Sequence, residues 1–360
     1  MAKPGSSVSP QADHRAGTAN ESQAQMKRSK PAETKLVICV RFRFSVWTAP
    51  AELADRIRKR WREINVVHLP DYEGLDAELT DTDIFVGFAL RPEQFCAARK
   101  LKWIHCTAAA VTQLMYPEIR ESQVIVTNSS GIHAIPMSEH VIGTLIALAR
   151  RFPDCFRHQE QRHWAAQDLF AAPIPPRELY GQTLLCIGFG ALGRAVARAA
   201  RSLGMRVLAV TRSGNGDTEL AERIFPVSRL AEALAQADFI VLAAPETPET
   251  NHLIGEREFL AMKPTAYFVN MARGPLVDEA AMIAALERGL IAGASIDVAT
   301  EEPLPTESAL WKAKNLFITP HVSAVSERLW ERQAELLMEN LERWFDGREL
   351  VNRVDLERGY

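Results

Sequence analysis

The sequence predicts an α/β protein with two doubly wound parallel-sheet domains and a cleft between them. Two separate series of short apolar runs alternate with stretches of helical periodicity, a pattern typical of parallel βα units. A long apolar helix, residues 136–151, lies between the two series, and 360 residues suffice for two hydrophobic cores. Only the second series carries a glycine-spaced turn, G-x-G-x-x-G. Together these observations favour two domains over one large sheet.

Composition excludes several classes of protein. With a formal net charge of −3, the chain offers no electrostatic case for binding nucleic acid or an anionic membrane surface. No apolar run is long enough to span a bilayer, and the N-terminus lacks the apolar core of a secretory signal. The 5 cysteines have neither close pairs nor metal-ligand spacing. We therefore expect no metal site, and a location in the reducing cytoplasm.

The first series follows a polar N-terminal segment. Residues 1–34 are rich in Ser, Ala, Gln, Lys and Pro without apolar periodicity, which predicts a flexible tail. A processed targeting segment is the alternative, but Asp13, Glu21 and Glu33 are unusual in transit peptides. From Lys35 on, strands are predicted over 36–40, 65–69, 84–88, 103–106 and 124–127, with a helix over 51–61.

The second series begins at Thr183, after a proline-rich connecting arm over residues 157–180. Strands are predicted over 184–187, 206–210, 239–243, 267–270, 292–298 and 316–319. Gly204 has the placement of a glycine that ends a helix. A final amphipathic helix is predicted over 326–345, ended by Gly347.

The glycine-spaced turn predicts a dinucleotide site. It follows the strand at 184–187 and opens an amphipathic helix, so its backbone N–H groups can receive a pyrophosphate at the positive end of the helix dipole. The predicted cofactor-binding residues here are Gly188, Gly190, Ala191, Leu192 and Gly193. A glycine turn in some other α/β protein is the alternative.

The end of the next strand indicates which dinucleotide. NAD sites usually carry an acid there, about 20 residues past the turn, to bind the ribose 2′-hydroxyl. Here the chain reads Thr211-Arg212-Ser213, and a guanidinium with two hydroxyls suits a 2′-phosphate. We predict that NADP(H) is preferred and that NAD(H) is possible. In the alternative, Arg212 is a solvated loop residue.

Three polar residues follow successive strands of the second series: Arg273, Glu302 and His321. Each alone has an ordinary structural explanation, but α/β proteins bind ligands at the carboxyl ends of their strands. A guanidinium can bind a substrate carboxylate, and an imidazolium can give a keto oxygen its proton. A neighbouring carboxylate stabilises that imidazolium. The trio predicts hydride transfer between the dinucleotide and a small 2-keto or 2-hydroxy acid.

These motifs resemble the D-isomer-specific 2-hydroxyacid dehydrogenase family. The resemblance rests on the glycine turn and on residues 270–279, 296–298, 302–305 and 319–321, with supporting matches at 101–105, 131–133 and 138–140. The C-terminal residues resemble the glyoxylate/hydroxypyruvate reductase-like branch. This similarity implies that Arg273, Glu302 and His321 are catalytic.

The resemblance also implies a Rossmann-type cofactor domain, 134–323, inserted into a flavodoxin-like substrate domain, 35–133 with 324–360. It implies a homodimer that buries the 136–151 helix. Asp297 would lie near the nicotinamide carboxamide, His321 would also contact the cofactor, and Ala243, Pro245 and Ala272 would line the cofactor's walls.

The chain departs from the family pattern in its substrate loop. The family's Ser-x-Gly-Val-Asp is replaced by 108–112, so Ala109 and Ala110 are expected to hold the substrate carboxylate with Arg273. A phosphoglycerate dehydrogenase-like enzyme and a dinucleotide-sensing, corepressor-like scaffold are the alternatives. Formate dehydrogenase is disfavoured, because those relatives carry Gln where Glu302 stands.

Overall fold

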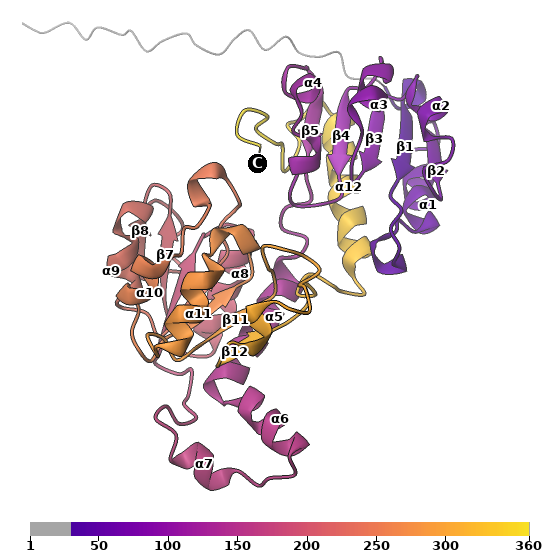
Figure 1. Cartoon of the computed structure of the whole chain (residues 1–360). Helices are drawn as coiled ribbons and strands as arrows, with labels where there is room; N and C mark the ends of the chain where they lie inside the picture. Colours follow the sequence, from indigo (N-terminus) through magenta and orange to yellow (C-terminus); the bar gives the residue numbers. More distant parts are fainter. Residues whose placement is uncertain (1–29, 360) are drawn as a thin grey trace, which may run out of the picture.

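The computed structural model describes residues 30–359, so most of the predicted N-terminal tail lies outside the described residues. The chain contains two sheets, and all strands in each are parallel (Figure 1). One has five strands in the order β2-β1-β3-β4-β5, and the other has seven in the order β12-β11-β10-β9-β6-β7-β8. The predicted class, two parallel-sheet α/β domains, is confirmed.

The first sheet is sandwiched between two helical layers. Its strands are β1 (Lys35–Cys39), β2 (Asn65–Leu69), β3 (Ile84–Gly87), β4 (Trp103–Cys106) and β5 (Ile125–Thr127). Alternate side chains face α1 (Ala51–Arg60) and the C-terminal α12 (Leu329–Phe345). The others face α2 (Leu75–Leu79), α3 (Pro92–Ala97) and α4 (Pro117–Arg120). Helix α12 is fixed by stacking of Trp344 on Trp103, with ring centroids 5.6 Å apart.

The second sheet contains β6 (Thr183–Ile187), β7 (Arg206–Thr211), β8 (Arg223–Pro226), β9 (Phe239–Leu242), β10 (Tyr267–Asn270), β11 (Gly293–Ile296) and β12 (Leu316–Ile318). One face packs on α5 (Ala134–Ala149) and α8 (Ala191–Ser202). The other packs on α9 (Leu230–Leu234), α10 (Glu256–Ala261) and α11 (Glu279–Glu287). The doubly wound arrangement puts the carboxyl ends of all seven strands at one edge.

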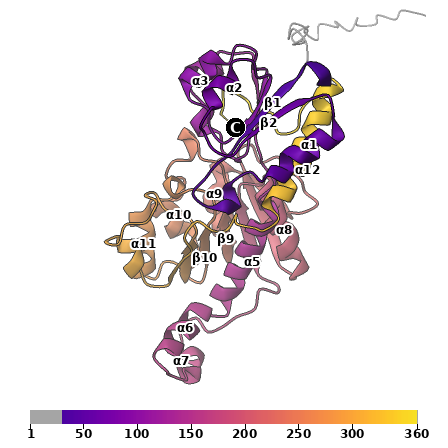
Figure 2. The ribbon, with the colours of Figure 1, turned by 90° about the vertical axis from the view of Figure 1, so that its right-hand side faces the viewer.

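The chain passes between the sheets twice, once from β5 into α5 and once from β12 into α12. The predicted domain limits, at 133/134 and 323/324, fall in these two connections. Figure 2 shows α5 leading away from the first domain and continuing toward α6 (Phe152–Glu160) and α7 (Ala166–Phe170). These two helices form an arm that projects from the second domain.

Several local predictions were wrong. The long helix ends at Ala149 rather than 151, because Arg151 adopts a left-handed φ of 59° before α6 starts. Part of the arm was expected to lack regular structure but contains α7. The edge strand β8 was missed. Gly204, with a φ of 75°, does end α8 as predicted.

Among residues 30–359, no helix combines the length and apolarity needed to cross a membrane.

Candidate active site

Strand register brings the predicted catalytic residues to one edge of the second sheet. Asn270, Ile296 and Ile318 are aligned across β10, β11 and β12. Arg273 lies three residues past Asn270, and His321 lies three residues past Ile318. Glu302 follows the same edge of the middle strand.

Glu302 and His321 form a direct pair. The Oε2 atom of Glu302 lies 2.6 Å from Nδ1 of His321, and its Oε1 atom accepts a 2.9 Å hydrogen bond from the backbone N–H of Ala299. The carboxylate is therefore held by its own loop while it orients the imidazole. The His321 side chain is 45% exposed, so the ring is accessible to a ligand.

Asp297 supports the loop that carries His321. Its buried carboxylate accepts hydrogen bonds from the Thr319 hydroxyl (2.6 Å) and from the backbone N–H groups of Val322 and Ser323 (3.0 Å each). Its carbonyl accepts a 2.8 Å bond from the N–H of His321, whose φ is 53°. Asp297 thus stabilises the loop's unusual conformation, a role that the sequence did not indicate.

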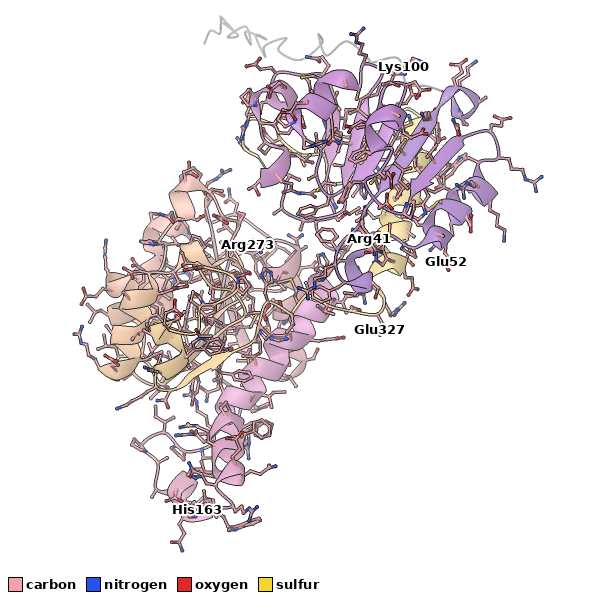
Figure 3. All side chains as sticks on the ribbon, turned by 45° about the vertical axis from the view of Figure 1, so that its right-hand side comes forward. Arg41, Glu52, Lys100, His163, Arg273 and Glu327 are labelled. Carbon is pink, nitrogen blue, oxygen red and sulfur yellow. The ribbon has the colours of Figure 1, made fainter. Side chains whose placement is uncertain are left out.

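The Arg273 turn is shaped by its neighbours. The Asn270 amide accepts from the N–H of Ala272 and donates to the carbonyl of Arg273, both at 3.0 Å. Gly274 leaves no space for a Cβ atom, because the backbone of Ala299 and Thr300 packs against it. The loops after β10 and β11 are therefore in close contact. Figure 3 labels Arg273 on the side of its domain nearest the first domain.

His133, the residue before α5, contacts the first domain and feels the charge of Arg273. Burial lowers the pKa of His133; the backbone of Ala324 opposes this shift, and the positive charges of Arg332 and Arg273 add to it. The ring packs edge-on against Trp47, with centroids 6.1 Å apart. In the sequence, residues 131–133 support the family resemblance, but they indicate no particular role for His133.

The glycine turn has the geometry that a pyrophosphate requires. Gly188 has a φ of 93°, and a Cβ atom there would lie 2.6 Å from the backbone of Ala243. A Cβ at Gly193 would strike the carbonyl of Gly188, whereas the space around Gly190 is open. Ala191 and Leu192 begin α8, so their N–H groups precede the helical hydrogen-bonding pattern. The residues present fit a dinucleotide.

The end of β7 presents Arg212 and Ser213 as exposed residues. The Thr211 hydroxyl instead closes the local turn, accepting from the N–H of Gly214 and donating to the carbonyl of Asn215, both at 3.0 Å. The pKa of Glu249 is lowered by its own backbone N–H, by Thr247 and, to a smaller extent, by the charge of Arg212. Arg212 therefore lies near the loop after β9, which also carries Ala243 and Pro245.

Ala109 and Ala110 lie in the loop after β4, at the carboxyl edge of the first sheet. The buried Ala272 follows β10, beside Arg273. Within residues 30–359, no cluster of three or more His, Cys, Asp or Glu side chains could hold a metal ion.

Sequence comparison relates the chain to known oxidoreductases. Residues 142–323 match the D-isomer specific 2-hydroxyacid dehydrogenase, NAD binding domain family. A glyoxylate reductase of Thermococcus gammatolerans is 34% identical over 304 residues, which cover 83% of this chain and 86% of the relative. A glyoxylate reductase of Pyrococcus furiosus is 35% identical over 276 residues, covering 75% and 81%.

Solved structures give the same relationship. A D-isomer specific 2-hydroxyacid dehydrogenase family protein from Aeromonas salmonicida has a TM-score of 0.76 and 30% identity, covering 90% of this chain and 99% of that one. A D-isomer specific 2-hydroxyacid dehydrogenase from Xanthobacter autotrophicus, solved with NADPH and MES, has a TM-score of 0.76 and 27% identity, covering 91% and 100%. The chain thus belongs to the D-isomer specific 2-hydroxyacid dehydrogenase family, in its glyoxylate reductase branch, and is an NAD(P)-dependent oxidoreductase.

Proposed function

We propose that this enzyme transfers a hydride between NADP(H) and a small 2-keto or 2-hydroxy acid of the glyoxylate or hydroxypyruvate type. The observation that carries the proposal is the Glu302–His321 pair, 2.6 Å apart, on the strand edge that also bears Arg273 and the glycine turn. The names of the relatives, glyoxylate reductases, support a small substrate.

In this proposal, the nicotinamide supplies or receives the hydride when bound. The protein binds the substrate carboxylate and transfers the proton. Glu302 holds Nδ1 of His321, so Nε2 gives the keto oxygen its proton during reduction and takes it back during oxidation. Arg273 binds the substrate carboxylate and polarises the keto oxygen. The backbone N–H groups of Ala109 and Ala110 bind the same carboxylate.

The preference for NADP(H) rests on Arg212 and Ser213 at the end of β7, where a 2′-phosphate would lie. No carboxylate occupies residues 211–213 to repel it. The relative from Xanthobacter autotrophicus was solved with NADPH, which supports this choice.

A substrate panel with both cofactors tests the proposal. We expect NADPH oxidation with glyoxylate or hydroxypyruvate at a higher kcat/KM than NADH oxidation, and Arg212→Asp should shift the preference toward NADH. A wild-type preference for NADH would contradict the cofactor assignment. Faster turnover of 3-phosphohydroxypyruvate would favour a phosphoglycerate dehydrogenase-like enzyme. Tight NADPH binding without turnover of any acid would favour the sensing scaffold.

We further propose that the enzyme is a homodimer assembled through the arm. Large apolar side chains are exposed there: Phe152, Phe156, Trp164 and Phe170, with Trp164 92% exposed. A hollow of about 500 Å³ lies at the base of the arm, lined in part by Ile174, Trp311 and Phe317. Clustered apolar exposure of this kind marks protein contact surfaces.

Two further assignments are also proposals. We divide the chain into a substrate domain, 35–133 with 324–360, and a cofactor domain, 134–323. Each of the five cysteines is a free thiol, which is consistent with the reducing cytoplasm as its location.

A further inference from the structure

The loop that follows β4 is fixed through its carbonyl groups. The carbonyl of Cys106 accepts a hydrogen bond from the Ser129 hydroxyl at 2.8 Å, and that of Thr107 accepts from the Gln333 amide at 2.6 Å. Farther along, the carbonyl of Ala108 accepts from the N–H of Ser129 (2.9 Å), and that of Ala109 accepts from the Asn128 amide (2.8 Å). Four consecutive carbonyls are thus held from the β5–α5 connection and from α12.

This arrangement determines where the loop's N–H groups point. In a planar trans peptide the N–H points away from the preceding carbonyl, so holding the carbonyls directs the N–H groups to the opposite side. Within residues 30–359, no acceptor pairs with the N–H groups of Ala109 or Ala110, whereas the N–H of Ala108 is directed to Sγ of Cys106. Two successive N–H groups without a partner, those of Ala109 and Ala110, form a site for an anion.

Among the residues that donate to these carbonyls, Gln333 is the most distant from the loop in sequence. It lies in α12, is 3% exposed, and uses both ends of its amide. While Nε2 donates to Thr107, Oε1 accepts from the Ser129 hydroxyl at 2.9 Å. Ser129 in turn holds Cys106 and Ala108. One side chain therefore supports three of the four fixed carbonyls, directly or through Ser129.

We propose that Gln333 is a positioning residue for substrate, which holds the 107–110 loop so that the N–H groups of Ala109 and Ala110 receive the substrate carboxylate. This inference rests on the proposed function, in which that loop binds the carboxylate. It adds a residue on α12, outside the glycine turn and the catalytic trio, that controls affinity for the acid and not for the cofactor.

The test compares Gln333→Met with a matched control. Asn340 lies on the same helix, is 0% exposed, and also holds backbone with both ends of its amide, but it binds Val351 (2.7 and 3.1 Å) instead of the substrate loop. Gln333→Met should raise the KM for the keto acid about tenfold, the effect of losing a buried hydrogen bond to the loop, with little change in kcat or in the Kd for NADPH. Asn340→Leu should lower Tm without changing that KM.

An equal rise in KM for both variants, or an unchanged KM in Gln333→Met, would overturn the proposal. Amide hydrogen exchange separates this inference from the proposed function. If the wild type reduces no keto acid, the proposed function fails, yet Gln333→Met should still exchange faster over residues 107–114 than the wild type and Asn340→Leu. Equal exchange in all three proteins would refute the positioning role on its own.

Discussion

At the residue scale, His321 is held by two different acids. Its imidazole is oriented by Glu302, while its backbone is held in a left-handed conformation by Asp297. Two carboxylates therefore act on one histidine, the first on its ring and the second on its loop. Substitutions at the two acids should have different signatures, because only Glu302 contacts the ring.

Removing the imidazole should abolish proton transfer and leave the cofactor turn intact. We expect His321→Ala to lower kcat/KM by about 100- to 10,000-fold, the usual contribution of a general acid. Glu302→Gln, which weakens the support of the charged ring, should cost less, about tenfold. Steady-state kinetics and NADPH titration measure both effects. Near-normal turnover in His321→Ala would show that another group supplies the proton.

His105 makes stability depend on pH. It is fully buried in β4, and burial lowers its pKa to about 4 from 6.5. His105 is therefore protonated near pH 6.5 in the unfolded chain but only near pH 4 in the folded protein. Folding stability should be fully present above pH 6.5 and fall between these values, by at most about 3 kcal/mol.

Urea unfolding at pH 7.5 and pH 4.5 measures this loss. His105→Asn removes the titrating group, so its loss of stability over the same interval should be smaller than that of the wild type. Parallel curves for the two proteins would assign the acid sensitivity to other groups.

At the scale of elements, the glycines in the turn between β6 and α8 have different roles: Gly188 and Gly193 are required by the fold, and Gly190 is proposed to face the ligand. Gly188→Ala forces a Cβ atom to within 2.6 Å of the Ala243 backbone at a φ of 93°, so it should lower stability by about 2 kcal/mol. Gly190→Ala points its methyl group into open space. That variant should keep its Tm and lose NADPH affinity at least tenfold. Thermal unfolding and fluorescence titration distinguish the pair, and unchanged affinity in Gly190→Ala would place the pyrophosphate elsewhere.

The elements differ in how well the sequence predicts them. The buried central strand β10 follows an apolar run and was predicted to the residue, whereas the ends of its neighbours β9 and β11 differ from the prediction by one or two residues. The edge strand β8 is only four residues long, begins with a charged residue and ends with a proline, and has one fully buried side chain, Phe225, so periodicity misses it. The trio was recognisable because each of its members follows a predicted strand of the second series. The supports of the loops, Asp297 and Gln333, depend on contacts between distant segments, which no local pattern contains.

At the scale of the whole molecule, two connections join the domains, and both lie near His133. The backbone of Ala324, in the second connection, opposes the burial-induced fall in the pKa of His133, in the first. The loop after β4 is held by α12, which follows the second connection, and by Asn128 and Ser129, which lie in the first. The proposed acid-binding loop is thus supported from both connections, whereas the proposed cofactor turn lies within one domain.

The arm should determine the assembly state without contributing to the chemistry. His163 is labelled near its far end in Figure 3, well away from Arg273. Replacing two of its exposed apolar side chains, Phe156→Ser with Trp164→Ser, removes surface that is 60% and 92% exposed in the single chain. The double variant should have half the mass of the wild type by light scattering, because the apolar area that favours association is lost. Leu260→Ser, which removes a 55% exposed side chain on α10, is the matched control and should leave the mass unchanged. A wild-type protein that is already monomeric, or a double variant that stays dimeric, would exclude the arm as the interface.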